Sequence, residues 1–133
     1  MAKIDSKALE VSKYINSFLQ DYAPSHLTNS EHTIRAYDTT LTLYIGFLEI
    51  RGVKSCSFSA KSFERPIIED WLKWLSEERG CSAETCNNRL ASLRAFIKYL
   101  SSRDIKYLYL LNDARAIPLR TASKRKVSGL SKG

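Results

Sequence analysis

Short polar and basic side chains alternate with apolar ones between Ser82 and Leu100, at spacings typical of a helix. Five apolar residues recur every three or four positions and form one stripe: Cys86, Leu90, Leu93, Ile97 and Leu100. The positions off this stripe are Thr85, Asn88, Arg89, Ser92, Arg94, Lys98 and Tyr99. Hydroxyl, amide and guanidinium groups of this kind read base edges or hold phosphates in the DNA major groove. An ordinary solvated helix face is the alternative that the pattern leaves open.

A second polar surface is predicted at the start of a helix between Ser30 and Arg51. Ser30 and Ser82 are both expected to cap their helices, because a serine hydroxyl accepts a hydrogen bond from an orphan backbone N–H. The apolar stripe of this second helix consists of Ile34, Tyr37, Leu41, Tyr44 and Leu48. Its N-terminal half leaves small or polar residues beside that stripe, namely His32, Thr33, Arg35, Ala36 and Thr39.

Three further helical segments are predicted to position these two. The first runs from Ser6 to about Tyr22, where Pro24 and the polar residues after it break it. Another runs from Pro66 to Gly80, after a connector whose Phe58 and Phe63 should enter the core. The last spans about 104–116, with one side formed by Ile105, Leu108, Leu111 and Ala114. The sequence therefore predicts an all-α bundle of four to five helices.

The positive charge is concentrated at the C-terminus. The chain has 133 residues and a formal net charge of +7, yet residues 1–113 carry 15 basic and 14 acidic residues. Residues 114–133 carry six basic residues and no acid. Such asymmetry indicates a polyanionic partner for the tail, although basic termini that only solubilise a protein show the same composition.

The composition argues against several other functions. The cysteines at 56, 81 and 86 and the histidines at 26 and 32 lack the paired spacing of a metal site. No phosphate loop or nucleophile motif is present, and no apolar run is long enough to span a membrane. We therefore expect no metal, cofactor, small-molecule ligand or membrane contact. Cysteines of this kind are typical of a reduced, cytoplasmic protein.

Four segments, in order and spacing, resemble the N-terminal core-binding domain of tyrosine recombinases, the phage-integrase family. Residues 30–37 (SEHTIRAY) are similar to its S-x-x-T-[IL]-R-x-Y opening, and residues 82–96 (SAETCNNRLASLRAF) to its S-x-x-T-x-N-x-R-L-[AS]-x-[LI]-[RH]-x-F segment. Residues 71–80 (WLKWLSEERG) resemble the F-L-x-W-L-x-x-x-R stretch of transposon-borne members. Ala116 to Leu119 and the basic residues beyond resemble that subgroup's linker.

The resemblance implies a SAM-like helical domain over residues 1–118 and a basic linker over 119–133. In such recombinases this domain clamps duplex DNA opposite a catalytic domain, whose tyrosine attacks the scissile phosphate without metal or cofactor. No residue of this chain corresponds to that catalytic set, so we expect a fragment that is not an enzyme alone, from a full-length recombinase. The implied partners are double-stranded DNA and other recombinase protomers, in integration of a mobile element.

The resemblance also assigns residues to DNA contact, because the two predicted polar helices cross and face DNA in relatives. The expected contacts on these helices are Thr33, Arg35, Thr39, Thr85, Asn88, Arg89, Ser92, Arg94 and Lys98. Arg94 has an equal alternative, since relatives often use this position for internal packing or an ion pair. The linker residues Arg120, Lys124, Arg125 and Lys126 would run along the DNA.

Three functions remain open at this point. The first is the DNA-binding domain of a site-specific recombinase. The second is a free-standing DNA-binding regulator of the same fold. The third is a helical protein–protein adaptor whose basic tail only solubilises it, and this one predicts no affinity for duplex DNA even at low salt.

Overall fold

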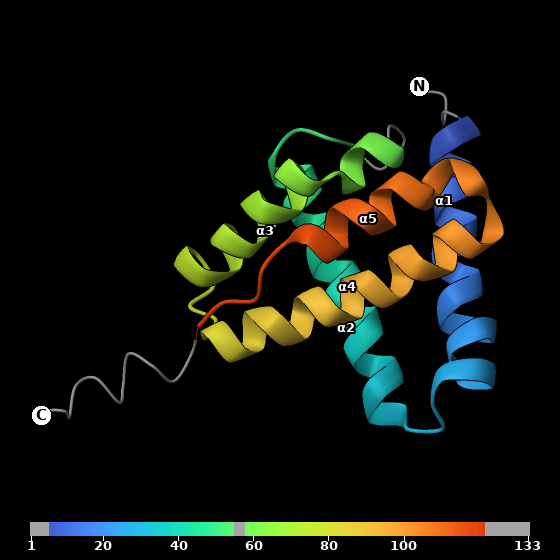
Figure 1. Ribbon diagram of the computed structural model, residues 1–133, viewed down its shortest axis with the longest axis horizontal. Helices are drawn as coiled ribbons and strands as arrows, with labels where there is room; N and C mark the ends of the chain where they lie inside the picture. Colours follow the sequence, from blue (N-terminus) through green and yellow to red (C-terminus); the bar gives the residue numbers. More distant parts are fainter. Residues whose placement is uncertain (1–5, 55–57, 122–133) are drawn as a thin grey trace, which may run out of the picture.

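The computed structural model describes residues 6–54 and 58–121, which form a bundle of helices with no strand in those ranges (Figure 1). The α-helices are α1 (Ser6–Ser17), α2 (Glu31–Ile50), α3 (Arg65–Glu77), α4 (Ala83–Arg103) and α5 (Leu108–Ala116). A π-helical segment, η1 (Phe18–Leu27), continues α1, and two 3-10 turns, η3 (Ala60–Phe63) and η4 (Ile105–Tyr107), precede α3 and α5. The all-α prediction is confirmed.

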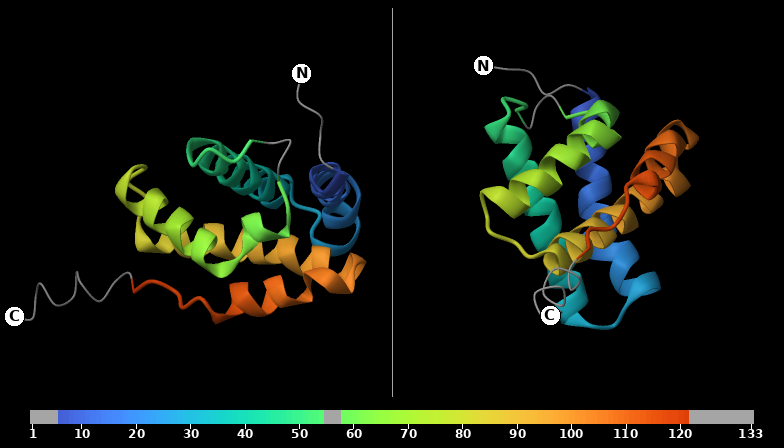
Figure 2. Two further views of the ribbon diagram at one scale, coloured as in Figure 1. Left: turned by 90° about the horizontal axis from the view of Figure 1, so that it is seen from above. Right: turned by 60° about the vertical axis from the view of Figure 1, so that its left-hand side comes forward.

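Helix α4 lies at the centre of the bundle. Helices α2, α3 and α5 all pack against it, with α5 running alongside and α2 crossing it (Figures 1 and 2). Each residue of the predicted stripe on α4 is at most 1% exposed. The apolar spacing therefore predicted correctly which side of this helix faces the core.

Local signals set the starts of α2 and α4 and the ends of α2 and α3 as predicted. The Ser30 hydroxyl accepts a hydrogen bond from the backbone N–H of Thr33, and the Ser82 hydroxyl accepts one from Thr85 at 3.1 Å. Gly52 and Gly80 follow α2 and α3 with φ angles of 92° and 68°. Glycine favours this left-handed region because it has no Cβ, so both residues stop the helix.

Two aromatic clusters fill the core and meet between η3 and α4. In the first, the ring of Phe18 contacts those of Phe96 and Tyr99. In the second, the ring of Tyr44 contacts those of Phe63 and Trp71 and its hydroxyl donates to the Ser62 carbonyl at 2.6 Å. The centroids of Phe63 and Phe96 lie 5.9 Å apart and join the clusters. The predicted burial of Phe58 and Phe63 is confirmed.

The end of the first helix and the environment of Tyr99 on α4 differ from the prediction. Pro24 does not break the first helix, because the chain widens into a π-helix that includes it. A wider turn accommodates a ring that would collide with the preceding carbonyl in an α-helix. Helix α1 and this extension pack over the C-terminal half of α4, where Tyr14 of α1 and Tyr22 of η1 contact the ring of Tyr99. Tyr99 is consequently buried, not part of the polar face.

The predicted inner side of the last helix is wrong at two of its four residues. Ile105 is 81% exposed and Leu108 is 45% exposed, whereas Leu111 and Ala114 are buried as predicted. Tyr107 and Leu110 are buried as well. At 100° per residue, Ile105 and Ala114 lie 180° apart around an α-helix, so the four predicted residues could not all face the core.

One ion pair ties α1 to η4 and predicts a pH effect on stability. Glu10 accepts hydrogen bonds from the Tyr107 hydroxyl and from the Lys106 ammonium. These bonds, that of Tyr107 first, hold the pKa of the Glu10 carboxyl below its ordinary value of 4.5. A lowered pKa stabilises the fold above the unfolded-state pKa, and this contribution is lost as the pH falls through the folded-state value.

We therefore expect Glu10→Gln to lower the free energy of unfolding by about 1 kcal/mol near pH 7, since the carboxyl is partly exposed. The difference from the unaltered chain should shrink as the pH falls below 4.5 and disappear once the pH passes below the lowered pKa of the folded state. Urea unfolding between pH 3 and pH 8 measures it, with the exposed Glu77→Gln as the control. A difference that persists unchanged at pH 3 would contradict the assignment.

Candidate nucleic-acid interface

The N-terminal halves of α2 and α4 diverge from the point where the two helices cross (Figures 1 and 2). Each half begins at a serine-capped terminus, where unpaired backbone N–H groups and the helix dipole favour an anion. Polar residues near these termini are thus placed at the ends of two rigid elements that a duplex could contact together.

On α4, four of the predicted residues lie on one side. Thr85, Asn88, Arg89 and Ser92 fall within about 100° of one another at 100° per residue. Asn88 is exposed and the other three are half-buried. The only acidic residue of α4 is Glu84, in the first turn. The structure thus brings hydroxyl, amide and guanidinium groups together on this side, which we call the α4 polar face.

No hydrogen bond or ion pair with another described residue engages the side chain of Arg89. Within the described residues it forms no ion pair, and its Nε–H is buried without an acceptor. A buried donor without a partner is uncommon in proteins and is often satisfied by a water or a ligand. The guanidinium is therefore available for an external acceptor such as a phosphate or a guanine edge.

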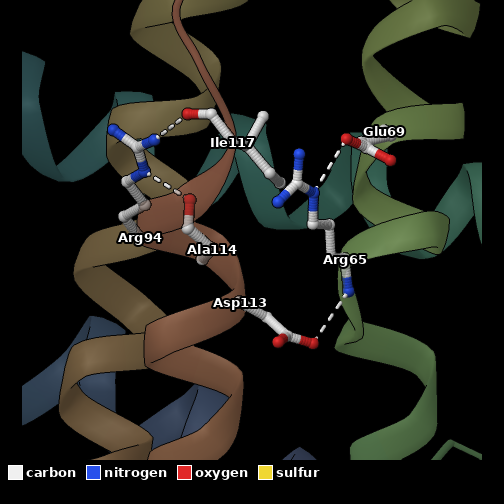
Figure 3. Close-up of polar contacts among 6 residues, drawn as sticks. All are labelled: Arg65, Glu69, Arg94, Asp113, Ala114 and Ile117. Carbon is white, nitrogen blue, oxygen red and sulfur yellow. Dashed lines mark hydrogen bonds and ion pairs between the residues drawn. The ribbon is translucent and has the colours of Figure 1, made fainter.

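Arg94 has a different environment (Figure 3). Its Nε donates to the carbonyl of Ala114 at 2.9 Å and one terminal nitrogen donates to that of Ile117 at 2.6 Å. A cation here satisfies carbonyls at the end of α5 and complements the helix dipole. Partial burial, and then the charge of Arg115, lower the pKa of the Arg94 guanidinium. The geometry favours the internal alternative, while DNA contact by Arg94 stays a prediction.

The predicted residues of α2 do not share one side. Arg35 and Thr39 are exposed one turn apart, but Thr33 lies about 160° from Arg35, at the end of the buried stripe. Arg35 lines a hollow of about 600 Å³ between η1 and α2, together with Glu31 and Asp38. These two acids make the surroundings of Arg35 less attractive to phosphate than those of Arg89.

The remaining predicted residues lie apart from the α4 polar face. Lys98 is exposed on α4, about 80° from Asn88 and toward the side that carries Arg94. Arg120 is exposed, and both of its backbone polar groups bond to the side chain of Asn87. Lys124, Arg125 and Lys126 lie outside the described residues.

Asn87 was not among the predicted site residues. It does stand at the asparagine of the T-x-N-x-R motif quoted above, which was the available signal. Periodicity alone could not reveal its role, because its partner lies 33 residues away in sequence.

The described residues hold no group of three histidine, cysteine or acidic side chains that could bind a metal. Among them there is also no helix that is long and apolar enough to cross a membrane. The expectations of no cofactor and of a cytoplasmic location stay predictions.

Comparison with known proteins identifies the family. Residues 15–104, about two thirds of the chain, match the family described as "Phage integrase, N-terminal SAM-like domain". The chain therefore belongs to the phage-integrase family and contains its N-terminal SAM-like domain. No curated protein and no solved structure was found to match it. The family assignment made from the four sequence segments is confirmed, while the transposon-borne subgroup stays a prediction.

Proposed function

We propose that this chain binds duplex DNA as the core-binding domain of a site-specific tyrosine recombinase. The observation that carries the proposal is the α4 polar face, where Arg89 has no acidic partner among the described residues and lies beside short hydrogen-bonding side chains. A protein–protein adaptor would not require a free guanidinium beside Asn88 and Thr85. The family supports the same function, because its members act in DNA recombination and integration.

In this proposal α4 presents its polar face to a groove of the duplex. Arg89 and Asn88 contact base edges or phosphates, and the Ser82 terminus offers backbone amides to a phosphate. Lys98 and the exposed residues Arg35 and Thr39 contact the flanking backbone. Residues 119–133 act as a basic linker along the DNA, and other recombinase protomers bind the same site. We assign these residues no role in strand cleavage.

Selection from a pool of random duplexes, followed by gel shift with random competitor, tests the proposal. The unaltered chain should enrich related sequences and retain them against competitor, and Arg89→Gln should lose this preference. The exposed Glu77→Gln, on α3, is the control and should behave as the unaltered chain. Absence of any duplex binding at low salt would contradict the proposal and favour the adaptor.

A further inference from the structure

Asn87 joins two parts of the chain that are distant in sequence. Its Oδ1 accepts a hydrogen bond from the backbone N–H of Arg120 at 2.8 Å, and its Nδ2 donates to the Arg120 carbonyl at 3.0 Å. One side-chain amide thus satisfies both backbone polar groups of one residue, as a neighbouring strand would do.

The segment that Asn87 holds is exposed and has no regular secondary structure to order it. Ile117 is buried, but the chain then runs without helix or strand through residues 118–121, which are all exposed. An exposed segment of this kind loses conformational entropy when it is ordered, and only specific bonds offset that loss. The two bonds from Asn87 therefore help to fix the path of the backbone at Arg120.

Arg94 and Asn87 act at two points along the same side of α4. They are seven residues apart, which places them about 20° apart around the helix and about 10 Å apart along it. Arg94 fixes the carbonyls of Ala114 and Ile117, and Asn87 fixes Arg120. The chain beyond α5 consequently runs back along α4 to the N-terminus of that helix (Figure 1).

We propose that Asn87 is a positioning residue. Its two bonds to Arg120, which we call the latch, hold the start of the basic segment (residues 119–133) beside the N-terminus of α4. Residue 120 then lies next to Cys81, Ser82 and Ala83, with which it lines one hollow. In sequence, the basic residues at 124–126 follow Arg120 after only a few positions. The contribution to DNA binding rests on the proposed function, whereas the latch itself does not.

Limited trypsin digestion of the folded chain tests the latch, because the bond after Arg120 is cleavable only when the segment leaves α4. Mass spectrometry measures the fragment that ends at Arg120. We expect Asn87→Ala to raise its rate of formation about tenfold, since two ordinary hydrogen bonds are lost. Asn87→Asp keeps the acceptor for the Arg120 N–H but loses the donor. Its cleavage rate should lie between those of the unaltered chain and Asn87→Ala. Asn88→Ala is the neighbouring control and should not change the rate.

A thermal unfolding curve for each variant shows that the digested protein is folded. If Asn87→Ala does not fold, the cleavage rate of Asn87→Asp tests the latch instead. An unchanged cleavage rate in the folded variants would overturn the latch.

Binding to a random duplex then tests whether the latch acts through the basic segment. Asn87→Ala should lower the affinity roughly three- to tenfold, because the segment must be ordered on binding. The loss should vanish when Lys124, Arg125 and Lys126 are all replaced by glutamine. A loss that persists in this triple variant would mean that Asn87 contacts DNA directly, and no loss in either background would mean that the latch does not serve DNA binding. Both results overturn the positioning role.

If the unaltered chain binds no duplex, the proposed function fails. The digestion experiment alone then tests the latch.

Discussion

Replacing Leu90 with alanine is expected to lower the free energy of unfolding by about 2–5 kcal/mol. Leu90 is 1% exposed on the core side of α4, so its removal leaves a cavity that the surrounding helices fill only in part. Arg89→Ala, one residue away, should affect DNA binding and leave stability nearly unchanged. It should change stability by only about 0.5 kcal/mol, because no ion pair or hydrogen bond of the described residues depends on its side chain.

DNA binding should separate the same two variants. Arg89→Ala should weaken duplex binding by about 1–3 kcal/mol if its guanidinium makes a bidentate contact. Leu90→Ala should bind as the unaltered chain does, per folded molecule. Urea unfolding and fluorescence anisotropy on one preparation measure both quantities. If Arg89→Ala unfolds the domain and leaves binding per folded molecule unchanged, the assignment of the two sides of α4 is wrong.

The basic segment should account for much of the salt dependence of binding. Replacing Lys124, Arg125 and Lys126 with glutamine should make the slope of log K against log salt shallower by about two to three units, since each phosphate contact contributes about −0.9. Residues 1–113 are nearly neutral, so few other phosphate contacts can compensate. Salt titrations of both chains, each on selected and random duplexes, measure the slopes.

Preference for the selected duplex should survive in the triple variant, because it comes from the α4 polar face. An unchanged slope would show that the segment is an idle terminus. Loss of the preference would show that sequence recognition depends on the segment and not on α4.

Features that depend on neighbouring residues in sequence could be predicted. The buried stripe of α4, the serine caps and the helix stop at Gly80 each follow from spacing or from one local bond. The side of α4 that carries Arg89 also follows from spacing, because one helix fixes the relative directions of its own residues.

Features that depend on distant contacts could not be predicted in this way. Tyr99 looked polar-facing because nothing in its own helix shows that η1 covers it. The roles of Arg94 and Asn87 depend on α5 and the chain after it, which approach α4 only in the folded domain.

Helix α5 has only nine residues, too few for a helix to persist alone in water. Its stability comes from its neighbours: Asp113 accepts the backbone N–H of Arg65 at the start of α3, and Tyr109 donates to Glu64 (Figure 3 shows the first contact). Opening α5 would therefore remove the hydrogen-bond acceptors of the first turn of α3 and of the Arg94 guanidinium at the same time. In hydrogen-exchange terms, the end of the domain and the start of α3 form one cooperative unit, so their amides should exchange with a common opening free energy.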